Sequence, residues 1–320
     1  MKWIIDTDFS TNSKKSLELL IKKNFDIIAI TTTYGPSYKN PNEVKEDIEF
    51  FLRSNNMSNI PVYAGAIQPY INFTKEFNDE IIIDPYNLET LKNSCYDNKK
   101  VSLEESASLK IIELCKIHKK ELNILTYSSL TNLSLSILLE SNLCNIFNKM
   151  YVVGGSTTGI SNSGNCSESN FRTDPVASKN VVLFFSNLIL IPLEIENSIK
   201  NILSNKIEVN GKSNLVDLEY VKNVYIKNKS ILQLVATLIL INQGIIKNEI
   251  ILPADVDITG KYSRGALSLE KYPWIESGTY SKINIIEELY TEKFIETIFS
   301  WIIQLIIKAL KYYLYYKIKI

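Results

Sequence analysis

Two carboxylates stand close together near the amino end of the chain, where an apolar run gives way to a polar turn. Asp6 and Asp8 are separated by one residue and directly follow Trp3-Ile4-Ile5. In an open α/β sheet such a run forms a strand, and ligands bind beyond the carboxyl ends of the strands. Alternate strand residues share a face, so both carboxylates can line one cleft. A carboxylate there can serve as a general base or as a ligand for a cation.

The elements that would position this pair follow an alternating pattern. Short apolar runs, rich in β-branched residues, alternate with stretches of helical periodicity. This alternation predicts an α/β fold with an open, mostly parallel sheet flanked by helices. No internal repeat or Pro/Gly-rich linker divides the chain, so we expect one domain over residues 1–310 and a Tyr/Lys/Ile-rich tail over 311–320. The expected strands lie at residues 4–5, 27–32, 61–64, 122–125, 150–153 and 188–193, and the expected helices at 17–21 and 42–53.

Composition excludes several classes of partner. The chain has 320 residues, and its 35 basic residues balance its 35 acidic ones. Zero net charge gives no attraction to nucleic acid or to an anionic membrane. The four cysteines are far apart and form no CxxC pair, which favours reduced thiols and a cytoplasmic location.

The end of the chain is strongly apolar. A helical pattern runs from Phe294 to Leu310, but Glu296, Gln304 and Lys308 interrupt it. A membrane span needs about 18 or more residues with few or no charges. We therefore expect a helix that packs on the core and does not cross a membrane.

Seven short segments occur along the chain in a recognisable order. They are Asp6–Ser13, Ile28–Gly35, Ile60–Ala66, Leu130–Leu133, Val152–Gly155, Glu168–Ala177 and Asp255–Gly265. Together, from residue 3 to about residue 270, they resemble the nucleoside hydrolase family, calcium-dependent enzymes that cleave the N-glycosidic bond of ribonucleosides. The resemblance implies a deep cleft at the carboxyl ends of the strands and a nucleoside or other ribosyl small molecule as ligand. Family members are commonly dimers or tetramers, and the sequence leaves a homo-oligomer open.

The resemblance also assigns a calcium site, of which only part is present. It implies that Asp8 is both a calcium ligand and the general base, that Asp6 is a second ligand, and that Tyr127 offers its backbone carbonyl. Ser13 stands where the family has a bidentate carboxylate, and Ile231 stands where it has an acidic residue in the C-terminal third. Calcium takes about six to eight oxygen ligands, and its affinity follows the number of carboxylates. We expect calcium to bind weakly here and catalysis to be impaired.

The positions of the ribose contacts are better preserved. The resemblance implies that Asn12, Glu168 and Asn170 bind ribose hydroxyls, with Asn162 or Asn165 as a further contact in an ambiguous register. The alternative for Glu168 is a solvated loop charge without a ligand.

Other charged residues bear on the same site. Lys14 and Lys15 put positive charge where a cation would bind, and the only histidine, His118, lies in a lysine-rich helix end and is not expected to be catalytic. Asp84 or Asp97 could bring a compensating carboxylate from a loop.

Three functions therefore remain open. The first is a divergent nucleoside hydrolase that still cleaves a ribosyl bond. The second is an inactive relative that binds a nucleoside or ribosyl ligand without metal. The third is a structural or partner-binding relative that uses the C-terminal helix and tail.

Overall fold

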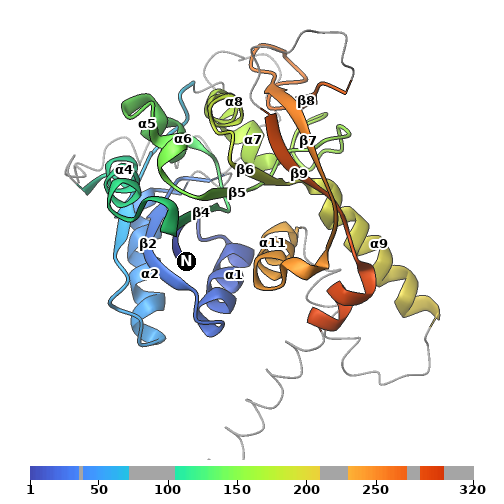
Figure 1. Ribbon diagram of the computed structural model, residues 1–320, viewed down its shortest axis with the longest axis horizontal. Coiled ribbons are helices and arrows are strands. Elements are labelled where there is room, and N and C mark those ends of the chain that lie inside the picture. The colour runs from blue at the N-terminus through green and yellow to red at the C-terminus, as the bar shows by residue number, and fades with distance from the viewer. Residues whose placement is uncertain (36–38, 72–104, 210–229, 272–281, 299–320) are drawn as a thin grey trace, which may run out of the picture.

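One mixed sheet runs through the protein (Figure 1). The computed structural model describes residues 1–35, 39–71, 105–209, 230–271 and 282–298. Within these ranges the sheet has nine strands in the order β3-β2-β1-β4-β5-β6-β9-β7-β8. The strands are β1 (Lys2–Thr7), β2 (Asp26–Thr32), β3 (Val62–Ala64), β4 (Leu122–Thr126), β5 (Lys149–Val153), β6 (Leu188–Ile191), β7 (Ile246–Val256), β8 (Leu267–Leu269) and β9 (Lys282–Leu289). The predicted open α/β sheet and single domain are confirmed.

The first six strands and β9 are parallel, whereas β7 runs antiparallel to β9 and to β8. The expected strand at 188–193 was too long. β6 ends at Ile191, and helix α9 (Leu193–Val209) begins after Pro192. Proline is suited to the entry of a helix because its φ is already near the helical value.

Helices cover both faces of the sheet, because successive apolar side chains along a strand point to opposite faces and both faces must be buried. In β1, Trp3 and Ile5 belong to one apolar cluster, whereas Ile4 belongs to the other. Helices α1, α2, α9 and α11 pack against the first face, and α4, α5, α6, α7 and α8 against the second. Their bounds are α1 (Thr11–Lys22), α2 (Pro41–Ser54), α4 (Ala107–His118), α5 (Thr131–Leu139), α6 (Leu143–Ile146), α7 (Ser169–Thr173), α8 (Pro175–Phe184) and α11 (Leu232–Ile241), with short 3-10 turns η2 (Lys119–Glu121) and η4 (Gln243–Ile245).

The C-terminal helix packs on the core as expected, as far as it is described. Residues 291–298 are helical, and Phe294 and Ile298 are buried in the first cluster. The remainder, 299–320, including the predicted tail at 311–320, lies outside the described residues. No helix in the described part of the chain combines the length and apolarity that a membrane crossing requires.

Candidate functional site

Asp6 lies near the carboxyl end of β1, between β2 and β4, with its carboxylate turned to the α5 side. It pairs in register with Thr31 of β2 and Thr126 of β4. Its Oδ1 accepts hydrogen bonds from the Thr31 hydroxyl at 2.6 Å and the Asn132 amide at 2.8 Å. Its Oδ2 is buried without a protein partner. Burial raises the pKa of Asp6 from 3.8 to about 6, although both hydrogen bonds oppose the shift.

Asp8 follows the end of β1 and is 9% exposed. Its Oδ1 accepts from the Ser10 backbone N–H and from the Ser13 hydroxyl, both at 3.1 Å. Gly35, at φ +58°, passes so close that a Cβ there would lie 2.4 Å from the Asp8 Cβ, so only glycine fits. Burial raises the pKa of Asp8, and the hydrogen bonds from Ser10 and Ser13 oppose the shift.

Glu168 points into the protein, which contradicts the alternative of a solvated loop charge. It is 2% exposed and stands at the N-cap of α7. Its Oε2 accepts from three backbone N–H groups, those of Gly155 at 3.0 Å, Asn170 at 2.9 Å and Phe171 at 3.3 Å. Burial raises the pKa of Glu168 against the effect of these donors. The carboxylate thus joins the loop after β5 to the start of α7.

The side-chain amide of Asn170 forms hydrogen bonds to the carboxyl ends of two neighbouring strands, β4 and β5. Its Nδ2 donates to the carbonyl of Val153 at 2.8 Å and to that of Tyr127 at 3.2 Å. The Tyr127 carbonyl, expected to be a calcium ligand, therefore already accepts one hydrogen bond. Asn162 is exposed, and its Oδ1 accepts from the Ser169 N–H at 2.8 Å, which fixes the start of α7.

Asn12 lies in the first turn of α1, close to the segment that precedes α11. Its Nδ2 donates to the Ser230 carbonyl, and its Oδ1 is buried without a protein partner. The hydroxyl of Ser230 in turn donates to Glu196 of α9 at 2.8 Å. Sequence reasoning missed Glu196 and Ser230, because no motif marks either residue. It also gave no role to Asn132, although this residue stands in the recognised segment Leu130–Leu133.

The oxygen donors among the described residues do not fit the calcium site that the resemblance implies. Two carboxylates, Asp6 and Asp8, and the Tyr127 carbonyl are present at the strand ends. The Ser13 hydroxyl donates to Asp8 and so acts as a hydrogen-bond donor to the base. Ile231 is fully buried in the first apolar cluster and has no oxygen ligand in its side chain. Calcium affinity depends on carboxylate number, so this set is too poor for a site of the family's kind.

Lys14 and His118 lie in other settings. The Lys14 amine sits 5.6 Å from the centres of the Phe9 and Phe51 rings, so it makes cation–π contacts. His118 ends α4, beside the amino end of β4, away from the carboxyl ends where Asp6 lies. Asp84 and Asp97, the other candidates for a compensating carboxylate, fall outside the described residues.

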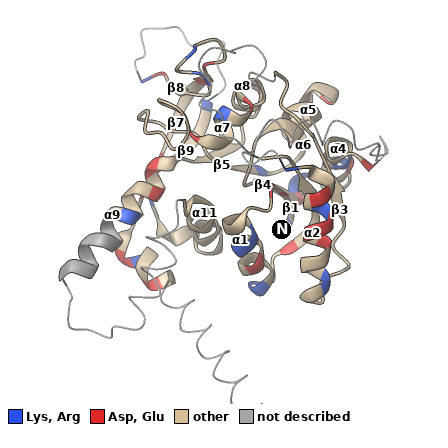
Figure 2. Cartoon of the chain, turned by 180° about the vertical axis from the view of Figure 1, so that it is seen from behind, with Lys and Arg blue, Asp and Glu red and all other residues tan. Residues whose placement is uncertain are grey.

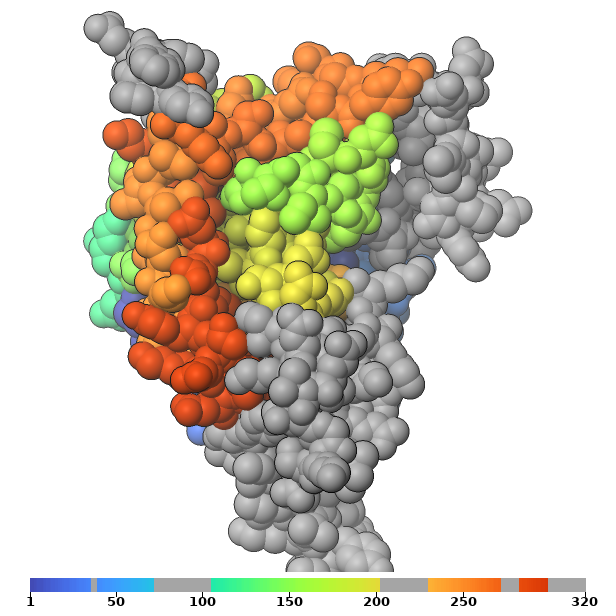
Figure 3. Space-filling view, turned by 90° about the vertical axis from the view of Figure 1, so that its right-hand side faces the viewer, coloured from blue at the N-terminus to red at the C-terminus, as the bar shows by residue number. Residues whose placement is uncertain are grey.

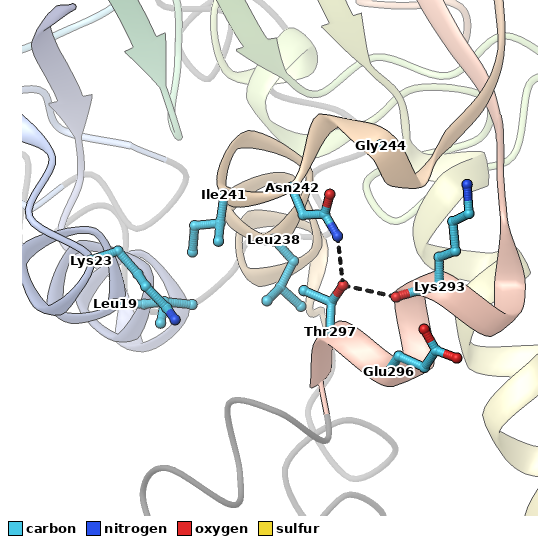
Figure 4. A pocket seen from close by; sticks show the side chains of 9 residues that line it. All are labelled: Leu19, Lys23, Leu238, Ile241, Asn242, Gly244, Lys293, Glu296 and Thr297. Atoms are coloured by element: carbon cyan, nitrogen blue, oxygen red, sulfur yellow. Dashed lines mark hydrogen bonds between the residues drawn. The ribbon is translucent and has the colours of Figure 1, made fainter.

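A separate hollow of about 590 Å³ opens at the other end of helices α1 and α11 (Figure 4). It is lined by Leu19, Lys23, Leu238, Ile241, Asn242, Gly244, Lys293, Glu296 and Thr297. The lining residues from α1 and α11 stand at the carboxyl ends of these helices, and the others come from η4 and from the helix at 291–298. Asn12, in contrast, stands at the amino end of α1, and Ser230 just precedes α11. The hollow is therefore distinct from the strand ends at which the carboxylate pair lies.

The titration of Asp6 leads to a prediction for stability. A carboxyl whose pKa is raised in the folded protein favours folding below its ordinary pKa of 3.8, and this contribution disappears as the pH rises to about 6. A shift of this size corresponds to about 3 kcal/mol. We expect the free energy of unfolding of the wild type, relative to Asp6→Asn, to fall by about 2 kcal/mol, most of that amount, between pH 4 and 6.5. Urea unfolding of both proteins in chelator, across this range, measures it.

The control for this prediction is Asp26→Asn, which removes an exposed carboxylate paired with Lys2. Its stability difference from the wild type should change little over the same pH range. A constant difference between wild type and Asp6→Asn would show that Asp6 is ionised throughout.

Comparison with known proteins agrees with the fold and the order of the motifs. A family model described as inosine-uridine preferring nucleoside hydrolase matches residues 3–296. A plant nucleoside hydrolase structure aligns with a TM-score of 0.69 at 15% identity, covering 92% of this chain and 96% of that chain. An inosine-guanosine nucleoside hydrolase gives 0.65 at 18% identity, covering 92% and 97%. A purine-preferring ribonucleoside hydrolase from Gardnerella vaginalis gives 0.65 at 15% identity, covering 93% and 96%.

Proposed function

Because the chain belongs to the inosine-uridine preferring nucleoside hydrolase family, we propose that its cleft takes a ribonucleoside and that hydrolysis of the N-glycosidic bond there is impaired. The observation that carries this proposal is the hydrogen bond from the Ser13 hydroxyl to Asp8. Ser13 stands where the resemblance implies a bidentate carboxylate for calcium. The scaffold and the candidate base are retained, whereas the ligand set for the cation is retained only in part.

Asp8 is the residue suited to act on water. Cleavage of a ribosyl bond passes through an oxocarbenium-like state, and a base that takes a proton from water assists the attack. The Ser10 N–H and the Ser13 hydroxyl hold one oxygen of Asp8 in place. Burial raises the pKa of Asp8, and this makes the carboxylate a stronger base.

Two other contributions to catalysis are weak in this cleft. A cation would lower the pKa of the attacking water, but the oxygen donors present do not fit calcium. His118, the only histidine of the chain, is too far from the strand ends to protonate the departing base. The expected result is slow turnover that depends on Asp8 alone.

Ribose release from a panel of purine and pyrimidine ribonucleosides tests the proposal, first with calcium and then with chelator. We expect slow release that chelator leaves unchanged. Asp8→Asn should lower it by a further factor of at least about 100, since a positioned base contributes roughly that much. Asp47→Asn, which changes an exposed carboxylate on α2, is the control. Fast, calcium-dependent release would contradict impaired catalysis and would mean that another ligand completes the site.

The second candidate is a protein that binds a ribosyl ligand and does not cleave it. Its support is the buried, unpartnered Oδ1 of Asn12, an acceptor suited to a hydroxyl group. Thermal shift with the same ribonucleosides distinguishes the two, because binding without release favours this candidate. Binding of none of them would favour the third function, a structural relative.

Location and assembly are also proposals. The three described cysteines, Cys115, Cys144 and Cys166, are free thiols, in keeping with a cytoplasmic protein. A homo-oligomer, common in the family, stays a prediction that light scattering can test.

A further inference from the structure

An ion pair between a buried glutamate and a partly exposed lysine lies at the start of α9, beside the segment that leads into α11. Glu196 is in the first turn of α9, and its side chain is 2% exposed. One carboxylate oxygen lies 2.5 Å from the Lys200 Nζ, and the other accepts the Ser230 hydroxyl at 2.8 Å. Figure 2 shows both signs of charge together at the start of this helix, and Figure 3 shows the same stretch, in yellow, next to the light-green segment after β5. Such a pair is stable only when further hydrogen bonds offset its desolvation.

Ser230 connects this pair to Asn12. Its backbone carbonyl accepts a hydrogen bond from Nδ2 of Asn12, in the first turn of α1. The Asn12 amide nitrogen already donates to Ser230, so the amide oxygen is the atom available to a ligand. That atom, Oδ1 of Asn12, is buried and has no hydrogen-bond partner among the residues that the structure describes. A buried acceptor without a partner is destabilising until a donor reaches it.

We propose that Lys200, Glu196 and Ser230 form a clamp that positions Asn12 to accept a hydrogen bond from a hydroxyl of the ribosyl ligand. This inference rests on the proposed function of the cleft. The clamp joins α9, the segment that leads into α11, and α1 through an ion pair and two hydrogen bonds. Through Asn12 the clamp gives the ribose a hydrogen-bond acceptor at a site where Ser13 and Ile231 replace the carboxylates that would bind a cation. Glu196 and Ser230 are positioning residues, because they act on the ligand through Asn12.

The test measures ribonucleoside affinity by calorimetry in chelator, with inosine, adenosine and uridine as probes. Ser230→Ala and Glu196→Gln should each weaken binding about five- to tenfold, Ser230→Ala because it loses the hydrogen bond to Glu196, and Glu196→Gln because it loses the charge that pairs with Lys200. Ser230→Thr keeps the hydroxyl and should stay within about twofold of the wild type. The loss should be larger for a ribonucleoside than for the 2′- or 3′-deoxy analogue that lacks the bonded hydroxyl.

A double-mutant cycle separates positioning from a general effect on the fold. In an Asn12→Ala background, Ser230→Ala should have no further effect on affinity, because the residue through which it acts is gone. Glu140→Gln is the matched control. It breaks another Lys–Glu pair, with Lys116 at 2.5 Å, and should bind as the wild type does. The melting temperature of each variant confirms that it is folded.

The outcomes are distinct. If the wild type binds a ribonucleoside but Ser230→Ala and Glu196→Gln bind it equally well, the clamp is wrong and the proposed function stands. Additive effects of Asn12→Ala and Ser230→Ala also overturn the clamp. If the folded wild type binds none of the probes, the proposed function fails, and the clamp fails with it.

Discussion

Glu168→Ala is expected to lower the free energy of unfolding by about 4 kcal/mol and to abolish ligand binding. The carboxylate accepts from the backbone N–H groups of Gly155, Asn170 and Phe171, all of which are buried. Alanine leaves these donors without a partner. Each buried N–H group without an acceptor lowers the free energy of unfolding by about 1–3 kcal/mol. The substitution also removes the N-cap of α7, the helix that carries Asn170. Urea unfolding and calorimetry with ribonucleosides measure the two effects.

Glu168→Gln is the matched variant. Its amide oxygen can still accept from the same backbone groups, so the expected loss of stability is only about 1 kcal/mol. If the Glu168 carboxylate contacts the ligand directly, Glu168→Gln should bind the ligand weakly although its stability is nearly normal. If Glu168→Ala unfolds no more easily than Glu168→Gln, the buried network around α7 does not contribute as its hydrogen bonds indicate.

Ser13→Asp is expected to make the stability of the protein depend on calcium. Ser13 is fully buried beside Asp8, so an aspartate there adds a third carboxylate to Asp6 and Asp8. In chelator, repulsion among these groups should lower the melting temperature below that of the wild type. Bound calcium should reverse the loss, since a ligand at about 100 times its Kd stabilises the folded state by about 2.7 kcal/mol. Calcium titrations followed by thermal unfolding measure this.

The wild type should show no comparable response to calcium. Ser13→Asn is the control for Ser13→Asp, because it has nearly the same size and no charge, and it should resemble the wild type in calcium. Ile231 is a poorer place for a restored ligand, since it lies fully buried in the apolar cluster beneath α11 and an aspartate there would destabilise the core. A strong calcium response of the wild type would contradict the mismatch described for this site.

Much of the fold followed from local pattern. Alternating apolar runs predicted the parallel strands, because strands buried on both faces consist of nearly continuous apolar residues. Asp6 and Asp8 could be placed at a strand end for the same reason, and the structure puts Asp6 in β1 and Asp8 just beyond it. The end of β6 was misplaced by two residues, since Leu193 continues the apolar run and yet begins α9. Hydrophobicity alone does not separate a strand from the helix that follows it.

The surroundings of the site depended on residues that are distant in sequence. Asn132 reaches Asp6 across 126 positions, and Ser230 reaches Asn12 across 218. Nothing local marks Glu196 as buried, because a glutamate in the first turn of a helix is ordinarily a solvated partner of the helix dipole. The sequence by itself determined the scaffold and the carboxylate pair, since periodicity and motif order are local properties. Only the tertiary structure decided which side chains hold that pair and Asn12, because those hydrogen bonds exist once α1, α5, α9 and α11 are packed on the same sheet.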